Sequence, residues 1–137
     1  MPPATFPWVT YTDPELAQVG PNEEQARRQH GDGICVLHAD FSETDRAQAE
    51  GEIEGFLKAV LSKRGHVLGA TIVGAHAGEL ILPWVLAISE ARFALANVVV
   101  PYPTLSEITR RAAGSYYTPT LFSERTRKLV RFLGVFG

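Results

Sequence analysis

The segment Tyr102-Pro103-Thr104-Leu105-Ser106-Glu107 holds the residues whose types and spacing are best suited to chemistry. A tyrosine phenol has an ordinary pKa of about 10, so at neutral pH it donates a hydrogen bond but rarely accepts a proton. Tyr102 is therefore better suited to positioning a ligand or stabilising a thiolate than to general-base catalysis. The alternative is a packing role, because buried tyrosines often serve as large amphipathic fillers.

Glu107 has a structural interpretation of its own. It follows Thr104 by three positions, which is the spacing of a capping box, in which the glutamate reaches back to the amide of the N-cap residue. We favour this interpretation because a cap alone stabilises a helix by about 1 kcal/mol and needs no further partner.

The other polar residues do not assemble into a second site. Cys35 is the single cysteine, so the chain has no internal disulfide and no redox pair, and we interpret it as a small buried hydrophobe. His38 lies three positions further along a predicted strand, on the opposite face, so no shared metal is expected. Glu79 and Glu90 would be about 16 Å apart along a helix, too far for a glycosidase-type carboxylate pair.

The elements that must position these residues follow from the apolar pattern. Asn22 is the expected N-cap of a helix that ends at Gly31, with Gln25 completing a capping box. Pro83 should kink a later helix or delay its start toward Leu80. Strands are predicted at 6–12, 15–20, 34–41, 54–61, 67–73 and, as a buried strand or its remnant, 98–100. Further helices are predicted at 77–91, 105–113 and 123–133, with a polar link at 45–51 and a hairpin turn at 62–66. The order predicts one α+β domain with a mostly antiparallel sheet covered by helices.

Composition excludes several classes of function. At 137 residues, 45% hydrophobic and 20% charged, the chain has the size and balance of one soluble globular domain. A net charge of −2 gives no basis for binding nucleic acid. The longest strongly apolar stretch, 80–88, is too short to cross a bilayer, and the first residues do not resemble a signal peptide. We therefore expect a cytoplasmic protein.

The helix predicted at 77–91 is apolar over most of its surface. Leu80, Trp84 and Ala87 form one stripe, and Ile81, Val85 and Ile88 form another beside it. Such a helix needs cover from its own sheet and from something else. A second copy of the chain is the simplest cover, which predicts a homodimer with Leu80, Ile81, Trp84 and Ile88 in the interface. The alternative is an entirely intramolecular core.

Several motifs between Phe6 and Glu107 resemble, in order, the C-terminal dimerisation domain of the FAD-dependent pyridine nucleotide–disulfide oxidoreductases. They are the entry strand at 10–20, the helix start Glu23-Glu24-Gln25-Ala26, the link Asp45-Arg46-Ala47, the hairpin at 55–58 and 68–74, and the helix start Ala77-Gly78-Glu79-Leu80-Ile81. The 102–107 segment resembles the His-Pro-Thr-x-x-Glu signature of that family, with tyrosine in place of histidine.

The resemblance implies a dimerisation domain over residues 1–114, with 115–137 as a C-terminal amphipathic helical extension. It implies that Tyr102 and Glu107 occupy the positions of the family's histidine–glutamate dyad, where the glutamate orients the histidine. It also implies that Tyr102 and Pro103 reach the FAD of the partner subunit, and that Pro103 and Thr104 lie in the dimer interface.

The chain lacks a Gly-x-Gly-x-x-Gly turn and a cysteine pair. By resemblance, FAD and NAD(P)H belong to upstream domains of a parent enzyme, of which this chain would be a catalytically idle fragment. The mercuric-reductase branch is similar in having tyrosine at this place, but the chain does not end in that branch's cysteine pair. One alternative is a free-standing interaction module, and a self-contained small enzyme is the weakest option.

The basic segment 123–133 interleaves arginine and lysine with apolar residues. A basic amphipathic helix can lie on an anionic membrane, but we favour packing against the parent enzyme or a partner for so short a helix.

Overall fold

The computed structural model describes residues 6–90 and 94–118, and its centre is an antiparallel five-stranded sheet with the spatial order β1-β2-β5-β4-β3. The strands are β1 (Trp8–Thr10), β2 (Glu15–Val19), β3 (Ile34–Asp40), β4 (Phe56–Ser62) and β5 (Val67–Gly74). β4 and β5 form the predicted hairpin, in which the Ser62 amide donates to the His66 carbonyl at 2.8 Å.

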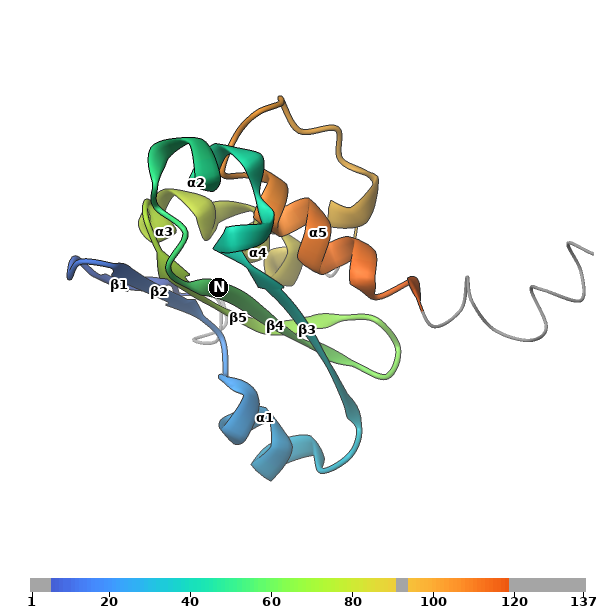
Figure 1. Ribbon diagram of the computed structural model, residues 1–137. Coiled ribbons are helices and arrows are strands. Elements are labelled where there is room, and N and C mark those ends of the chain that lie inside the picture. Colours follow the sequence, from blue (N-terminus) through green and yellow to red (C-terminus); the bar gives the residue numbers. More distant parts are fainter. Residues whose placement is uncertain (1–5, 91–93, 119–137) are drawn as a thin grey trace, which may run out of the picture.

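Helices cover this sheet, as the sequence predicts for an α+β domain. Within the described residues they are α1 (Glu23–His30), α2 (Asp45–Glu50), α3 (Ala77–Leu80), α4 (Leu82–Ser89) and α5 (Glu107–Ser115), together with the 3₁₀ turns η2 (Phe41–Glu43) and η3 (Leu95–Asn97). Figure 1 shows α2, α3, α4 and α5 on one side of the sheet and α1 on the other. The α+β class and the mostly antiparallel sheet are confirmed.

The start of α1 follows the local sequence. The Asn22 side chain accepts a hydrogen bond from the Gln25 amide at 2.9 Å, and the Gln25 side chain accepts one from the Asn22 amide at 3.0 Å. Two amides that the helix leaves without partners are thus satisfied, which confirms the predicted capping box. The helix ends at Gly31, whose φ of 56° suits a residue without a Cβ.

The apolar helix predicted at 77–91 is divided in two. α3 ends at Leu80, Ile81 forms the junction, and α4 begins at Leu82 with Pro83 in its first turn. Proline is accepted there because the first amides of a helix have no intrahelical acceptor. The break therefore takes the place of the predicted kink.

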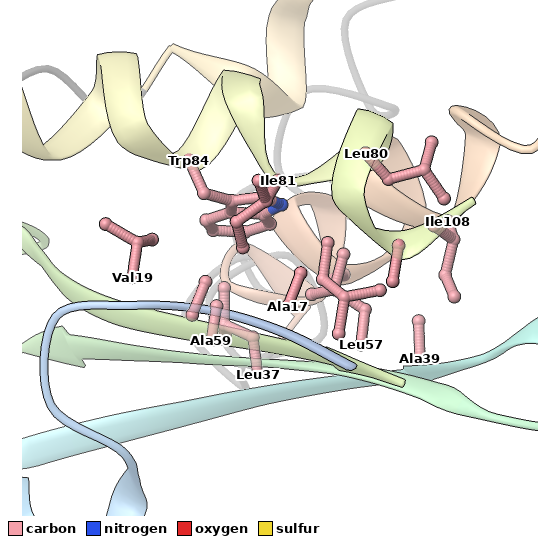
Figure 2. Close-up of a cluster of buried hydrophobic side chains, with 14 of the residues drawn as sticks. Ala17, Val19, Leu37, Ala39, Leu57, Ala59, Leu80, Ile81, Trp84 and Ile108 are labelled. Atoms are coloured by element: carbon pink, nitrogen blue, oxygen red, sulfur yellow. The ribbon is translucent and has the colours of Figure 1, made fainter. Parts of the chain in front are cut away.

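The core lies between the sheet and the helices on its α2–α5 side. Figure 2 shows Leu80, Ile81, Trp84 and Ile108 meeting side chains that rise from the strands, among them Val19 and Leu37. Alanine supplies 10 of the 22 buried hydrophobic residues that the structure describes, so helices and sheet approach one another closely.

Three expectations differ from the structure. Residues 45–50 form α2, which buries Ala47, and are not an irregular link. The predicted strand at 98–100 is wrong, because this segment pairs with no strand in the described part of the chain and Val99 is 93% exposed. Gly114 lies inside α5 and does not end it. The helix predicted at 123–133 falls outside the described residues.

Candidate functional site: the 101–107 segment and the adjoining apolar face

Tyr102 lies in the connection between η3 and α5, which arches over the helical side of the domain (Figure 1). Its side chain is 69% exposed, so the packing interpretation does not describe its position in this chain. The Tyr102 hydroxyl donates a hydrogen bond of 2.6 Å to Oδ2 of Asp45, in the first turn of α2. Sequence reasoning missed this partner because 57 positions separate the two residues.

The electrostatics of this contact fix the protonation state of Tyr102. The hydrogen bond to the Asp45 carboxylate raises the pKa of Tyr102, and the negative charges of Asp45 and, to a smaller extent, Glu107 act in the same direction. The phenol is therefore protonated at neutral pH and is a poor general base. This agrees with the expectation from its residue type.

Glu107 does not form the predicted capping box with Thr104. The N-cap of α5 is Ser106, and its side chain makes no capping bond, whereas the Thr104 hydroxyl lies before the cap and donates to the Pro101 carbonyl at 2.7 Å. The Glu107 amide instead donates to the Thr104 carbonyl at 3.3 Å. The capping-box prediction is wrong because α5 begins at Glu107, which is therefore the first helical residue and not the third.

The Glu107 carboxylate is left with an unused acceptor. Its Oε2 atom is buried and has no hydrogen-bond partner within the part of the chain that the structure describes. No hydrogen bond joins Glu107 to Tyr102, whose hydroxyl is held by Asp45. The structure therefore brings Tyr102 together with Asp45 and does not form a Tyr102–Glu107 pair.

An apolar groove adjoins this segment on the outward side of α4. It has a volume of about 500 Å³, and its lining runs from α4 through the 98–101 segment to α5. Its large apolar side chains are strongly exposed: Leu82 is 59%, Leu86 53% and Val98 46% exposed. A contiguous exposed apolar surface of this kind is typical of an interaction site.

The predicted interface residues of this helical region lie on its inner side. Leu80, Ile81 and Trp84 are at most 8% exposed because they pack against this chain's own sheet, and partly buried Ile88 packs against the same core. The Trp84 indole also donates to the Thr109 hydroxyl at 3.3 Å, which joins α4 to α5. The outward face of α4 instead carries Leu82 and Leu86. Pro103 is exposed and Thr104 half-buried, so both stay predicted interface residues.

The remaining candidates stay separate. Cys35 packs partly against the core while His38 is exposed and pairs with Asp40 at 3.0 Å, in agreement with their predicted opposite faces. Glu79 and Glu90 are both exposed. Within residues 6–90 and 94–118, no group of three acidic, histidine or cysteine side chains could hold a metal ion.

The helices of residues 6–90 and 94–118 are too short or too polar to cross a membrane.

Residues 6–113 match the family model described as the pyridine nucleotide-disulphide oxidoreductase dimerisation domain. The chain belongs to this family. The match includes all five strands and most of α5, and it contains both the 102–107 segment and the apolar groove.

Similar proteins agree with this membership. The chain is 39% identical over 111 residues to the dihydrolipoyl dehydrogenase of Bacillus subtilis (strain 168), covering 79% of this chain and 23% of that protein. It is also 39% identical over 109 residues to the mitochondrial dihydrolipoyl dehydrogenase of Caenorhabditis elegans, covering 77% and 22%. The solved structure of LpdA from Mycobacterium tuberculosis aligns with a TM-score of 0.78 at 26% identity, covering 85% of this chain and 26% of that one. The chain thus spans about a quarter of the length of these relatives.

Proposed function

We propose that this chain is the homodimerisation domain of an FAD-dependent, NAD(P)H-linked disulfide oxidoreductase of the cytoplasm. In this role it holds two subunits together and places the 102–107 segment at the flavin site of the partner subunit. FAD and NAD(P)H bind to upstream domains of the same parent protein, and the chain alone carries no catalysis. The observation that carries this proposal is the exposed apolar groove beside the 102–107 segment.

The groove supports a second copy as its occupant. Leu82 and Leu86 lie one turn apart on α4, so they present one continuous stripe on its outward face. Val98 and Val99 extend this stripe toward Tyr102. A two-fold axis through such a stripe would bury it on both subunits at once, because each patch needs to complement only itself. The same contact would carry each 102–107 segment onto the neighbouring subunit.

The shape of the 102–107 segment fits a role across an interface. Tyr102 and Pro103 are exposed, and the hydrogen bond to Asp45 holds the Tyr102 ring in place at the surface. An exposed aromatic ring held in place suits contact with a planar cofactor or its substrate. The chain lacks the glycine-rich dinucleotide fingerprint, so its share of a flavin site would be this projecting segment.

Sedimentation velocity of the chain and two single variants tests the dimer. Leu86→Asp places a charge in the groove, so we expect a monomer, whereas the unaltered chain should be a dimer. Ile53→Asp is the matched control, because Ile53 is 48% exposed, close to the 53% of Leu86, and does not line the groove. A monomeric unaltered chain at high micromolar concentration, or an equal effect of both variants, would contradict the proposal.

The flavin role is tested in the full-length protein. Replacing Tyr102 by phenylalanine should lower turnover while dimer formation is unchanged, because only the hydroxyl is removed. Unchanged kinetics would leave the segment as part of the interface alone. A dimer whose upstream sequence carries neither a dinucleotide fingerprint nor a cysteine pair would instead favour the alternative of a free-standing interaction module.

A further inference from the structure

The hydrogen bond between Tyr102 and Asp45 has a fixed polarity. A carboxylate has no hydrogen to donate at neutral pH, so the proton of the 2.6 Å bond comes from the phenol. Hydrogen bonds from a hydroxyl to a carboxylate are shorter and stronger than those between neutral groups. The single hydrogen of the Tyr102 hydroxyl is therefore already used within this chain.

The carboxylate is held on a fixed support. Asp45 stands in the first turn of α2, directly after Thr44, which is fully buried and donates its hydroxyl proton to the Phe41 carbonyl at 2.9 Å. Ala47, two residues further on, is fully buried as well. The start of α2 is thus anchored on both sides of Asp45, and the Asp45 side chain itself is free to face the 102–107 segment.

The charged groups around the phenol leave this bond without a competitor among the described residues. Arg46, the neighbouring cation on α2, is paired with Glu50. Glu107, at the start of α5, contributes a second and weaker negative charge. Asp45 and Glu107 therefore both favour the protonated state of Tyr102.

We propose that Asp45 is a positioning residue for Tyr102: it accepts the hydrogen bond of the phenol and leaves the lone pairs of the phenol oxygen to face outward. Tyr102 then offers a hydrogen-bond acceptor, and not a donor, to the group that docks against it. A phenol oxygen whose hydrogen is engaged can still accept through its lone pairs.

The inference deepens the proposed function and rests on it only for the identity of the docking group. At a flavin or disulfide site, an acceptor selects groups that carry a hydrogen, such as a thiol S–H or an amide N–H. It disfavours a thiolate, because two acceptors facing each other share no proton. This reverses the expectation from residue type alone, in which Tyr102 stabilises a thiolate by donating to it.

The test follows Tyr102 by NMR in the 137-residue chain with tyrosine labelled at the ring carbon that carries the hydroxyl, with Tyr102→Phe assigning its resonance. In the unaltered chain we expect this carbon to be displaced toward the phenolate position at neutral pH and to titrate at a raised pH. Asp45→Asn should remove the displacement and move the titration of Tyr102 to lower pH, whereas Asp45→Glu, which keeps the carboxylate, should restore part of both.

Glu52→Gln is the matched control, because Glu52 is exposed just after α2 and its removal leaves the Arg46–Glu50 pair and the phenol untouched. It should leave the Tyr102 resonance in place. An unchanged Tyr102 titration in Asp45→Asn, or an equal change in Glu52→Gln, would overturn the inference.

The outcome is separable from that of the proposed function. Leu86→Asp tests the dimer and should leave the dependence of the Tyr102 resonance on Asp45 intact, because the bond to Asp45 lies within one chain. If the chain is monomeric and the resonance still depends on Asp45, the positioning role holds and the dimerisation role does not. The opposite pair of results would remove the positioning role alone.

Discussion

Replacing Trp84 by alanine distinguishes a core residue from an interface residue, which are the two roles that the sequence allows it. In the structure its indole is fully buried in the chain's own core and donates to the Thr109 hydroxyl at 3.3 Å. If this placement is right, the substitution lowers the stability of each single chain. If Trp84 instead faced a second subunit, the substitution would mainly weaken association.

The expected loss follows from the size of the side chain. Truncating a buried tryptophan to alanine costs about 3–5 kcal/mol, because the removed contacts are lost and the neighbours close the cavity only in part. A domain stable by about 5–15 kcal/mol would lose a large share of its free energy of unfolding. For a chain of this length we expect Tm to fall by about 10–20 °C. Thr109→Val, which leaves the buried indole N–H without its acceptor, should cost about 1–3 kcal/mol.

Urea unfolding followed by far-UV circular dichroism measures these losses. This signal is preferable to fluorescence, because Trp84→Ala removes one of the two tryptophans. Each variant is measured at two protein concentrations, since association would add a concentration-dependent term to the apparent stability. Leu86→Ala is the control, because Leu86 is 53% exposed and should cost less than about 1 kcal/mol at low concentration. A loss below about 1 kcal/mol for Trp84→Ala, or one present only at the higher concentration, would refute the placement.

Two further perturbations follow from backbone packing and surface charge. Gly69→Ala should prevent normal folding or strongly destabilise the chain in thermal unfolding, because the new Cβ would lie 2.1 Å from the Pro21 carbonyl oxygen. Gly114→Ala is the control: the new Cβ would have no atom within 4 Å, so stability should be unchanged or rise by up to about 1 kcal/mol. Equal behaviour of the two variants would contradict the close approach at Gly69. Glu23→Gln should make the free energy of unfolding depend less on pH in the acid range. The hydrogen bond from Lys58 lowers the pKa of Glu23, so the Glu23 carboxylate stabilises the fold above about pH 4.5, and this stabilisation is lost as the pH falls through the lowered pKa. Because the Glu23 side chain is 31% exposed, urea titrations between about pH 6 and pH 3 should differ by no more than about 1 kcal/mol, and identical profiles would contradict the pairing.

Local signals were sufficient to predict much of the fold. The Asn22–Gln25 capping box, the hairpin turn and the strands β2 to β5 depend on residues close in sequence, and each is found where the pattern places it. α2 was missed because its six residues bury only Ala47, which is too little to produce an apolar stripe. The 98–100 segment has strong β-branched propensity, but a strand also needs a pairing partner, and this segment has none in the described structure.

The candidate site depended more on tertiary contacts. The helix at 77–91 is apolar almost all round, so its period does not say which face meets the sheet, and the break at Ile81 decides that Trp84 turns inward and Leu86 outward. The spacing of Thr104 and Glu107 fitted a cap, but α5 begins later than that spacing requires, with Ser106 as its N-cap. The Asp45–Tyr102 bond joins segments 57 positions apart, and no local sequence pattern predicts such a contact.

The many alanines of the core set how this domain can be probed and how it tolerates change. Alanine scanning has nothing to remove at nearly half of the buried hydrophobic positions, so a conventional scan would report them as silent. Substitutions at these positions destabilise the fold when they enlarge the side chain, because the added carbon atoms would have to push a helix away from the sheet. Random mutagenesis should therefore find Ala59→Val or Ala112→Leu more destabilising than many substitutions that delete atoms. The short distance between the sheet and the helices thus limits the size of the side chains that these positions can accept.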